Sequence, residues 1–143
     1  MKMKRIQSEK GAALIEAAIT VPIILLISVG IFEFGRAYQT WQVLTNASRE
    51  GARLAVIEGS TDAEVRKRVT DYLTAGGLKT LTDDKIAVKR DVTLTATSTG
   101  SRIEISYPFE FMVLNPVVRL VAPTDTKTGA PITMAAATVM RNE

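Results

Sequence analysis

The sequence predicts an α+β protein in which one long N-terminal helix packs on a small antiparallel sheet. Two observations carry this prediction. Residues 12–57 contain an apolar run followed by apolar and small residues spaced three to four apart, which predicts one continuous helix over roughly this range. From residue 86 onward, apolar and polar residues alternate, the period of half-buried strands. Packing the sheet on the amphipathic part of the helix buries the apolar face of each.

The first part of the long helix has the composition of a membrane span. Between Ala12 and Phe32 there are 21 residues, and Glu16 is the only one that carries a charge. A helix of that length spans roughly 31 Å, which matches a hydrocarbon core of about 30 Å. A secretory signal peptide is the alternative, but this run is too long and lacks a small-residue cleavage site. We expect a transmembrane helix over residues 12–33, with a kink rather than a stop at Pro22.

Charge is concentrated before this run. Residues 1–11 carry four basic residues and Glu9, a net charge of +3, and the rest of the chain is neutral with 14 basic and 14 acidic residues. A basic N-terminus with a neutral body is typical of a membrane-topology signal and not of a nucleic-acid surface. We therefore expect a basic leader over residues 1–11 on the cytoplasmic side and an exported domain over residues 34–143.

The composition also limits the chemistry available. The chain has no cysteine and no histidine, which excludes disulfides, thiolate catalysis and the commonest general base and metal ligand. The adjacent carboxylates Asp83 and Asp84 are expected to precede a strand in a turn and not to bind a metal. No enzyme activity, metal or cofactor is expected.

The distal half of the helix is amphipathic, with apolar or small residues at Phe34, Ala37, Trp41, Leu44, Ala47, Gly51 and Ala55. Tyr38 and Trp41 fit either an interfacial aromatic belt or core packing against the C-terminal domain. Arg49 and Arg53 lie one turn apart, on either a solvated face or a contact surface for a neighbouring subunit. Gly51 allows a close backbone approach on the packed side.

The exported domain contains a short helix and strands. A capping box at Thr61 and Glu64 begins a helix over residues 62–75, which Gly76 and Gly77 end. Strands are expected on both sides of a turn at residues 98–101, with a bulge near residues 89–91 and Pro108 at a sheet edge. Residues 113–131 are expected to form a long loop with one apolar turn, 117–121. For residues 132–141 a strand is favoured over a helix.

Glu16 has two interpretations, because a charge inside a membrane-length run is costly and commonly marks a function. If residues 1–11 stay attached, Glu16 is a tolerated charge near the membrane surface. If the chain is cut after Gly11, a new α-amino group appears on Ala12, four residues before the carboxylate. In an assembly of parallel helices, the amine of one subunit then pairs with the carboxylate of the next.

These features resemble those of a known family. A basic leader, Gly11, four residues, Glu16 and a long apolar run resemble the type IV pilin processing signal G-x-x-x-x-E. Together with IFEFGRA and NASREGARLA, the stretch GAALIEAAITVPIILL is similar to the TadE-like family of the tight-adherence (Tad/Flp) pilus system. The resemblance covers about residues 10–57. It implies a pilin-like fold and a bacterial inner-membrane location. It also implies that Gly11 is recognised by a prepilin peptidase, that Ala12 is the mature N-terminus and that Glu16 is an assembly carboxylate.

The function that this resemblance implies is structural. It is that of a minor pilin or pseudopilin, in a homo- or hetero-oligomer within a type IV-like Flp pilus. The partners would be the prepilin peptidase, pilins and other Tad pilus assembly proteins, and the lipid bilayer. The alternative is an uncleaved single-pass membrane anchor whose exported domain binds a pilus or envelope partner.

Overall fold

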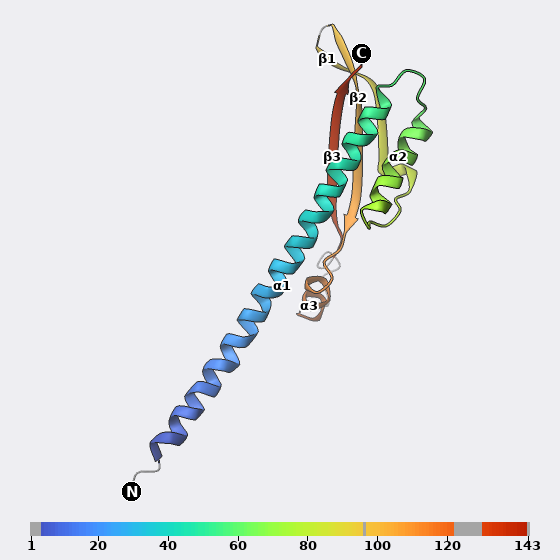
Figure 1. The fold of residues 1–143 in the computed structure, drawn as a ribbon. Coiled ribbons are helices and arrows are strands. Elements are labelled where there is room, and N and C mark those ends of the chain that lie inside the picture. Colours follow the sequence, from blue (N-terminus) through green and yellow to red (C-terminus); the bar gives the residue numbers. More distant parts are fainter. Residues whose placement is uncertain (1–3, 96, 122–129, 143) are drawn as a thin grey trace.

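The structure, a computed structural model, describes residues 4–95, 97–121 and 130–142 of the chain. A long helix runs from the N-terminal end into a small α+β head (Figure 1). Its helices and strands are α1 (Lys4–Ala55), α2 (Asp62–Ala75), the 3-10 turn η1 (Asp83–Lys85), β1 (Ile86–Thr95), β2 (Ser98–Phe109), α3 (Leu114–Val121) and β3 (Ile132–Arg141). The α+β prediction is confirmed.

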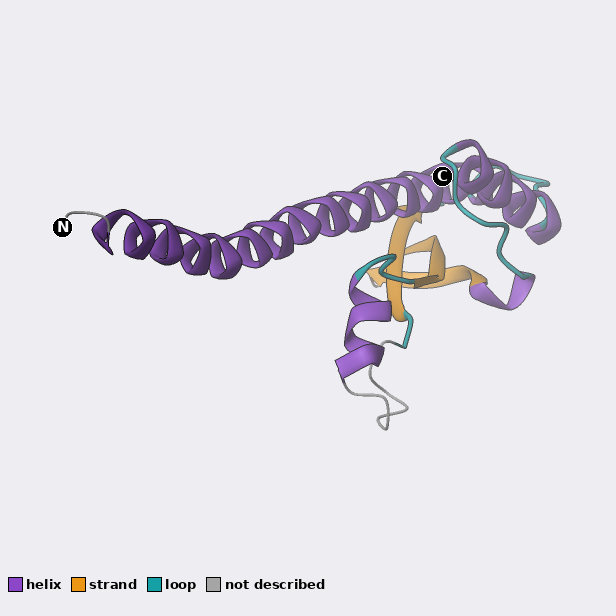
Figure 2. Ribbon diagram, turned by 90° about the horizontal axis from the view of Figure 1, so that it is seen from below, coloured by secondary structure: helices purple, strands orange, loops and turns teal. Residues whose placement is uncertain are grey.

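The long helix is continuous, as expected, but begins earlier. It has 52 residues and corresponds to about 78 Å at 1.5 Å per residue. It starts at Lys4 because nothing between that residue and Ala12 except Gly11 disfavours helix, and a single glycine costs only about 1 kcal/mol. Pro22 lies inside the helix without ending it. The N-terminal half extends alone, whereas the distal half packs in the head (Figures 1 and 2).

The second helix matches its prediction residue for residue. The Thr61 side chain accepts from the backbone N–H of Glu64, and the Glu64 carboxylate accepts from the backbone N–H of Thr61, so the capping box is complete. This bonding lowers the pKa of Glu64. Gly76 is the C-terminal cap, and Gly77 has the positive φ of 78° that glycine adopts without strain.

The three strands form one antiparallel sheet in the order β1-β2-β3. The favoured strand at the C-terminus is therefore confirmed. The predicted turn at residues 98–101 was wrong, because β2 already begins at Ser98 and the chain reverses between that residue and Thr95. The predicted bulge is present between Lys89 and Val92, where Asp91 has a φ of 54°.

The bulge explains why Arg90 interrupts the alternation of β1. Its guanidinium donates to the carbonyl oxygen of Ala55 at the end of α1 (2.8 Å) and to the Ser60 carbonyl (2.9 Å), and it pairs with Asp62 (2.7 Å). One side chain thus ties the end of α1, the start of α2 and the sheet together.

The segment around the end of β2 confirms one prediction and corrects another. Pro108 is at a sheet edge as predicted, because the pairing of β1 with β2 reaches only to Ile105 and leaves that end of the central strand β2 paired with β3 alone. Residues 114–121 form the eight-residue helix α3 and not a loop with one apolar turn. Pro116 is tolerated there because it lies in the first turn, whose N–H groups have no partner in the helix.

The core lies between one face of the sheet and the two helices α1 and α2. Ile103, Ile105, Tyr107 and Phe109 of β2 are buried against Leu44 and the small residues of α1. Phe34 and Trp41 have the helical spacing of this packed face but do not belong to it, since they are 67% and 46% exposed. Close approach of the sheet favours small side chains on the packed face: Ala37, Thr40, Ala47, Ser48, Gly51, Ala52 and Ala55.

Candidate functional site

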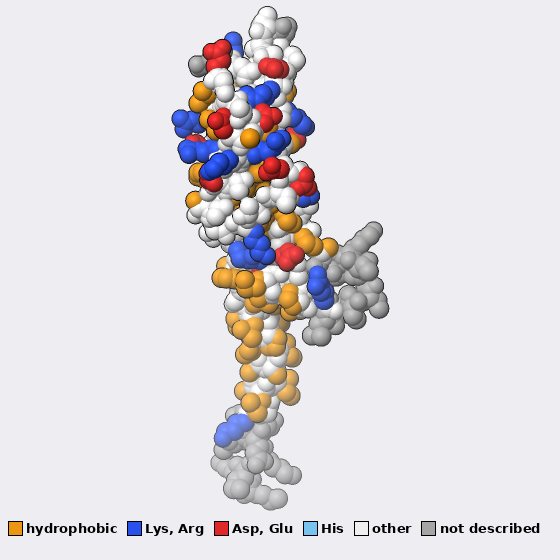
Figure 3. Space-filling model, turned by 90° about the vertical axis from the view of Figure 1, so that its right-hand side faces the viewer, with side chains coloured by type: hydrophobic (Ala, Val, Ile, Leu, Met, Phe, Trp, Pro, Cys, Tyr) orange, Lys and Arg blue, Asp and Glu red, His pale blue; other side chains and the backbone are white. Residues whose placement is uncertain are grey.

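The anchor segment, residues 12–32 of α1, is exposed along almost its whole length, and only Val29 and Gly30 in it are partly buried. Most of its large aliphatic side chains, from Leu14 to Ile31, are 52–72% exposed. The helix is long and apolar enough to cross a membrane, and its most apolar 18-residue window is not buried at all. In Figure 3 hydrophobic side chains cover this part of the helix, while charged side chains gather on the head.

Glu16 lies on this bare helix and is exposed, and so is Ala12. The four-residue spacing places both on one helical face, about one turn apart. Gly11 is also within α1, and a side chain added there would meet nothing within 4 Å. The Gly11–Ala12 bond therefore lies inside a continuous helix that is not covered by the head.

Where the anchor segment meets the head, the structure contains a buried carboxylate that the sequence reasoning did not single out. Glu33 is fully buried, accepts the backbone N–H of Val113 at 2.5 Å and pairs with Arg36 at 3.0 Å. Arg36 also donates to the carbonyl oxygen of Glu110 and stacks over the Phe109 ring at 4.6 Å. We call these five residues the junction.

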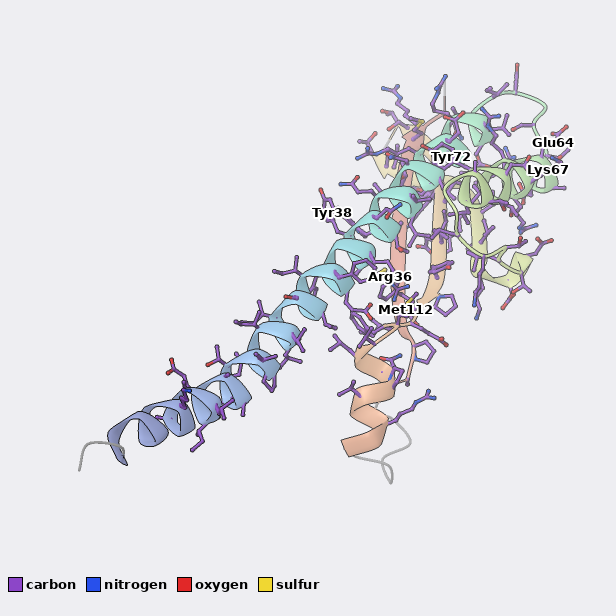
Figure 4. The ribbon with its side chains drawn as sticks, turned by 60° about the horizontal axis from the view of Figure 1, so that its bottom comes forward. Arg36, Tyr38, Glu64, Lys67, Tyr72 and Met112 are labelled. Atoms are coloured by element: carbon purple, nitrogen blue, oxygen red, sulfur yellow. The ribbon has the colours of Figure 1, made fainter. Side chains whose placement is uncertain are left out.

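The junction joins segments distant in sequence. Glu33 and Val113 are 80 residues apart, and the loop after β2 returns to α1 at the end of the apolar run. Arg36 and Met112 lie close together at the base of the head in Figure 4. Phe111 adds edge-to-face contacts with Phe109 at 5.2 Å and with Phe34 at 6.4 Å.

The two aromatic residues predicted beyond the apolar run remain on the surface. Tyr38 is 62% exposed and points away from the sheet (Figure 4), and Trp41 is 46% exposed. Their rings contact each other with centroids 6.0 Å apart. Core packing against the sheet, one of the two interpretations, does not occur, and the interfacial belt stays a prediction.

The residues predicted for subunit contact separate onto two sides of α1. Gly51 faces inward, where an added Cβ would lie 2.5 Å from Cγ2 of Val69. Gly51 is therefore in close contact with another part of the same chain and has no open surface for a neighbouring subunit. Arg49 is exposed and donates to the Asn46 side chain at 3.5 Å. Arg53, 71% exposed, lies 3.6 Å from Glu50.

Glu50 connects this face to the second helix. Its carboxylate accepts from the Arg68 guanidinium of α2 at 2.7 Å. This hydrogen bond holds the pKa of Glu50 below its usual range, and the charges of Arg68 and Arg53 act in the same direction. A depression of about 840 Å³ beside these side chains is lined by charges of both signs, with Glu58 and Arg141 on its wall besides Glu50, Arg53 and Arg68.

Among the residues that the structure describes, no group of three or more carboxylates is placed to hold a metal ion. Asp83 and Asp84 lie in η1, where Asp84 accepts from the Thr82 hydroxyl and pairs with Lys85 at 3.4 Å.

The fold and the site define a class: a protein with one bare helix of membrane-spanning length that continues without a break into a small α+β head. Residues 11–53 match the family model of the TadE-like protein family, which confirms the resemblance seen in the sequence. The match covers the anchor segment and most of the packed part of α1. No curated protein and no solved structure matches the chain.

Proposed function

We propose that this protein is a TadE-like pseudopilin, a structural component of a bacterial Tad/Flp pilus. The anchor segment holds it in the inner membrane, with the N-terminus cytoplasmic and the head exported. A prepilin peptidase cuts after Gly11. The observation that carries the proposal is that a bare apolar helix in a TadE-like segment bears one exposed carboxylate, Glu16, one turn beyond Ala12.

Processing creates the partner for this carboxylate. Hydrolysis of the Gly11–Ala12 bond adds one water molecule, leaving a carboxylate on Gly11 and an α-amino group on Ala12 that is protonated at neutral pH. When such helices lie parallel, the ammonium group of one chain meets Glu16 of its neighbour. In a setting poor in water, both groups need that partner, because an unpaired buried charge is costly.

The bond to be cut lies within a helix, so the chain must unwind locally before a peptidase can hold it extended. Gly11 lowers the cost of this step, because glycine disfavours helix by about 1 kcal/mol relative to alanine. No packing in the head has to break, since nothing lies within 4 Å of a Cβ placed at this position.

The first test measures the N-terminus of the protein extracted from membranes. We expect a chain that begins at Ala12 in cells with an active prepilin peptidase, and a chain that begins at Met1 in cells without it. The matched control is Gly11→Val, which we expect to remain uncut because a branched residue replaces the recognised glycine. An intact N-terminus in peptidase-active cells would refute processing.

The second test separates insertion from assembly. Glu16→Gln removes the charge and keeps the side-chain size, so the protein should insert in the membrane normally. We expect its recovery in sheared pilus fractions to fall at least tenfold, since a pair worth more than about 1.4 kcal/mol is lost. The control is Ser28→Ala, which removes another polar group of the anchor segment, one that donates to its own helix at 2.8 Å. Equal recovery of both variants would show that Glu16 has no pairing role.

The second candidate function is an uncleaved membrane anchor whose head binds a pilus or envelope partner. The exposed Arg49 and Arg53, on the outward side of α1, favour it as a contact surface for that partner. This hypothesis predicts that Glu16→Gln leaves pilus formation unchanged, while Arg49→Ala with Arg53→Ala reduces co-purification of pilus proteins after crosslinking. The pseudopilin proposal predicts a loss in the first variant.

A further inference from the structure

We propose that α3 lies in the interface of the membrane, beside the transmembrane part of α1, as a second membrane contact of the head. This inference rests on the proposed anchoring of residues 12–33 and adds to it an element outside the TadE-like match. Its occupant is the lipid bilayer.

The first argument is depth. Val113, the residue before α3, donates its backbone N–H to Glu33 at 2.5 Å, so the start of α3 is at the level where the apolar run of α1 ends. The rest of α3 lies on the N-terminal side of the sheet, next to α1 and away from the bulk of the head (Figure 1). If residues 12–33 cross the bilayer, α3 is at the boundary between hydrocarbon and water.

The second argument is direction. In Figure 1 α3 is seen nearly end-on while α1 lies lengthwise, and in Figure 2 the axis of α3 runs crosswise to α1. When α1 crosses the membrane, α3 therefore lies along the membrane plane. This is the orientation of interfacial helices, which bury an apolar face between headgroups and acyl chains.

The third argument is composition and exposure. The sequence of α3, LNPVVRLV, has five aliphatic residues and one charge, Arg119. Apolar side chains just before α3 and within it are exposed to solvent: Met112 is 63%, Val113 37% and Val117 46% exposed. The exposed apolar surface of the anchor segment ends at Phe32 with 61% exposure, next to Glu33, which accepts from Val113. Exposed apolar side chains gathered at that level are typical of a membrane interaction site.

The charges around α3 agree with this position. A groove of about 770 Å³ extends from α3 along the base of the head, and Arg36, Lys79 and Arg119 line it together with one carboxylate residue, Glu110. Cations just above an apolar face match the level of lipid phosphates. Cations beside exposed apolar side chains are typical of a segment at a membrane surface.

The experiment uses the full-length protein in lipid vesicles. The natural chain has no cysteine, so single-cysteine variants carry one environment-sensitive fluorophore each. The test positions are Val117→Cys and Met112→Cys, at exposed side chains. Leu26→Cys in the anchor segment is the positive control, and Lys67→Cys, far from α3 on α2 (Figure 4), is the negative control. Nitroxide-labelled lipids report contact with the bilayer by quenching.

We expect Leu26 and both test positions to show a blue-shifted emission and a loss of fluorescence with nitroxide lipids. Quenching at Val117 should be greatest with nitroxides near the headgroups, and at Leu26 with nitroxides deeper in the chains. Lys67 should not be quenched. If Leu26 is quenched and both test positions behave like Lys67, the interfacial position of α3 is refuted while the anchor stands. If Leu26 is not quenched, the anchor itself fails.

A second copy of the chain covering α3 is the competing outcome. It predicts that the blue shift at Val117 and Met112 fades as the protein is diluted in lipid, without quenching by nitroxide lipids. That result would also overturn the inference, whereas a shift independent of protein density supports it.

Discussion

The junction supplies the sharpest prediction, because one buried carboxylate holds the loop after β2 on the long helix. Glu33→Ala removes the acceptor of the Val113 N–H and the partner of Arg36. Arg36 keeps its bond to the Glu110 carbonyl and its contact with the Phe109 ring. We therefore expect local loosening of the loop and not global unfolding of the head.

The magnitude follows from the two bonds. A hydrogen bond to a charged group contributes about 1.5–3 kcal/mol, and a buried donor left without an acceptor costs about 1–3 kcal/mol. The desolvation of the carboxylate offsets part of this sum. We expect a net loss of about 2 kcal/mol in the free energy that opens the loop, equivalent to a roughly 30-fold increase in its open population.

Hydrogen exchange of the full-length protein in lipid measures this opening directly, at a peptide containing Val113. In Glu33→Ala the amide should exchange about 30-fold faster. Glu33→Gln should have a smaller effect, because it keeps an acceptor oxygen. The control is Glu110→Gln, since that side chain is exposed and the junction uses only its backbone carbonyl. Unchanged exchange at Val113 in Glu33→Ala would refute the assigned role of Glu33.

Two further predictions concern the packed half of α1. Gly51→Ala places a Cβ 2.5 Å from Cγ2 of Val69, whereas at Gly35 an added Cβ meets nothing within 4 Å. Thermal unfolding should therefore show Gly51→Ala to be less stable than Gly35→Ala by about 1–3 kcal/mol. Equal stability of the two variants would contradict the close approach at Gly51. Because Arg68 lowers the pKa of Glu50 below its usual 4.5 in the folded protein, that pair stabilises the fold above this pH and the contribution is lost in acid. The melting temperature should therefore fall less on acidification in Glu50→Gln than in the natural chain. An identical fall in both proteins would contradict the stabilising role of the Glu50–Arg68 pair.

Local features of this fold could be predicted from the sequence because they depend on short spacings. The period of α1, the capping box at Thr61 and the bulge before Val92 each follow from a few neighbouring residues. The two alternating runs likewise give paired strands, although the turn between them is tighter than the Ser-Thr-Gly-Ser sequence suggested. Gly100 is needed within β2 instead, since an added Cβ would lie 2.5 Å from the Met140 carbonyl oxygen of β3.

The junction could not be predicted in this way, since Glu33 and Val113 come together only in the folded chain. One signal was available: a carboxylate at the end of an apolar run, three residues before Arg36, suggests a buried pair. The helix α3 could not be predicted because it contains Pro116 and is only eight residues long. Phe34 and Trp41 matched the helical period of the packed face, but the sheet lies too close to α1 for large rings there.

The arrangement of contacts along α1 determines how the head relates to the membrane. Glu33 fixes the base of the head, the Ser48 hydroxyl meets that of Thr138 on β3 at 2.7 Å, and Arg90 holds the end of the helix at Ala55. The helix is continuous between these three contacts, so the described structure contains no flexible linker between anchor and head. A displacement of the anchor segment is therefore transmitted to the sheet through the continuous helix α1. If chains assemble through residues 12–33, the heads must take the spacing of their helices, and loosening the junction should impair assembly even with Glu16 intact.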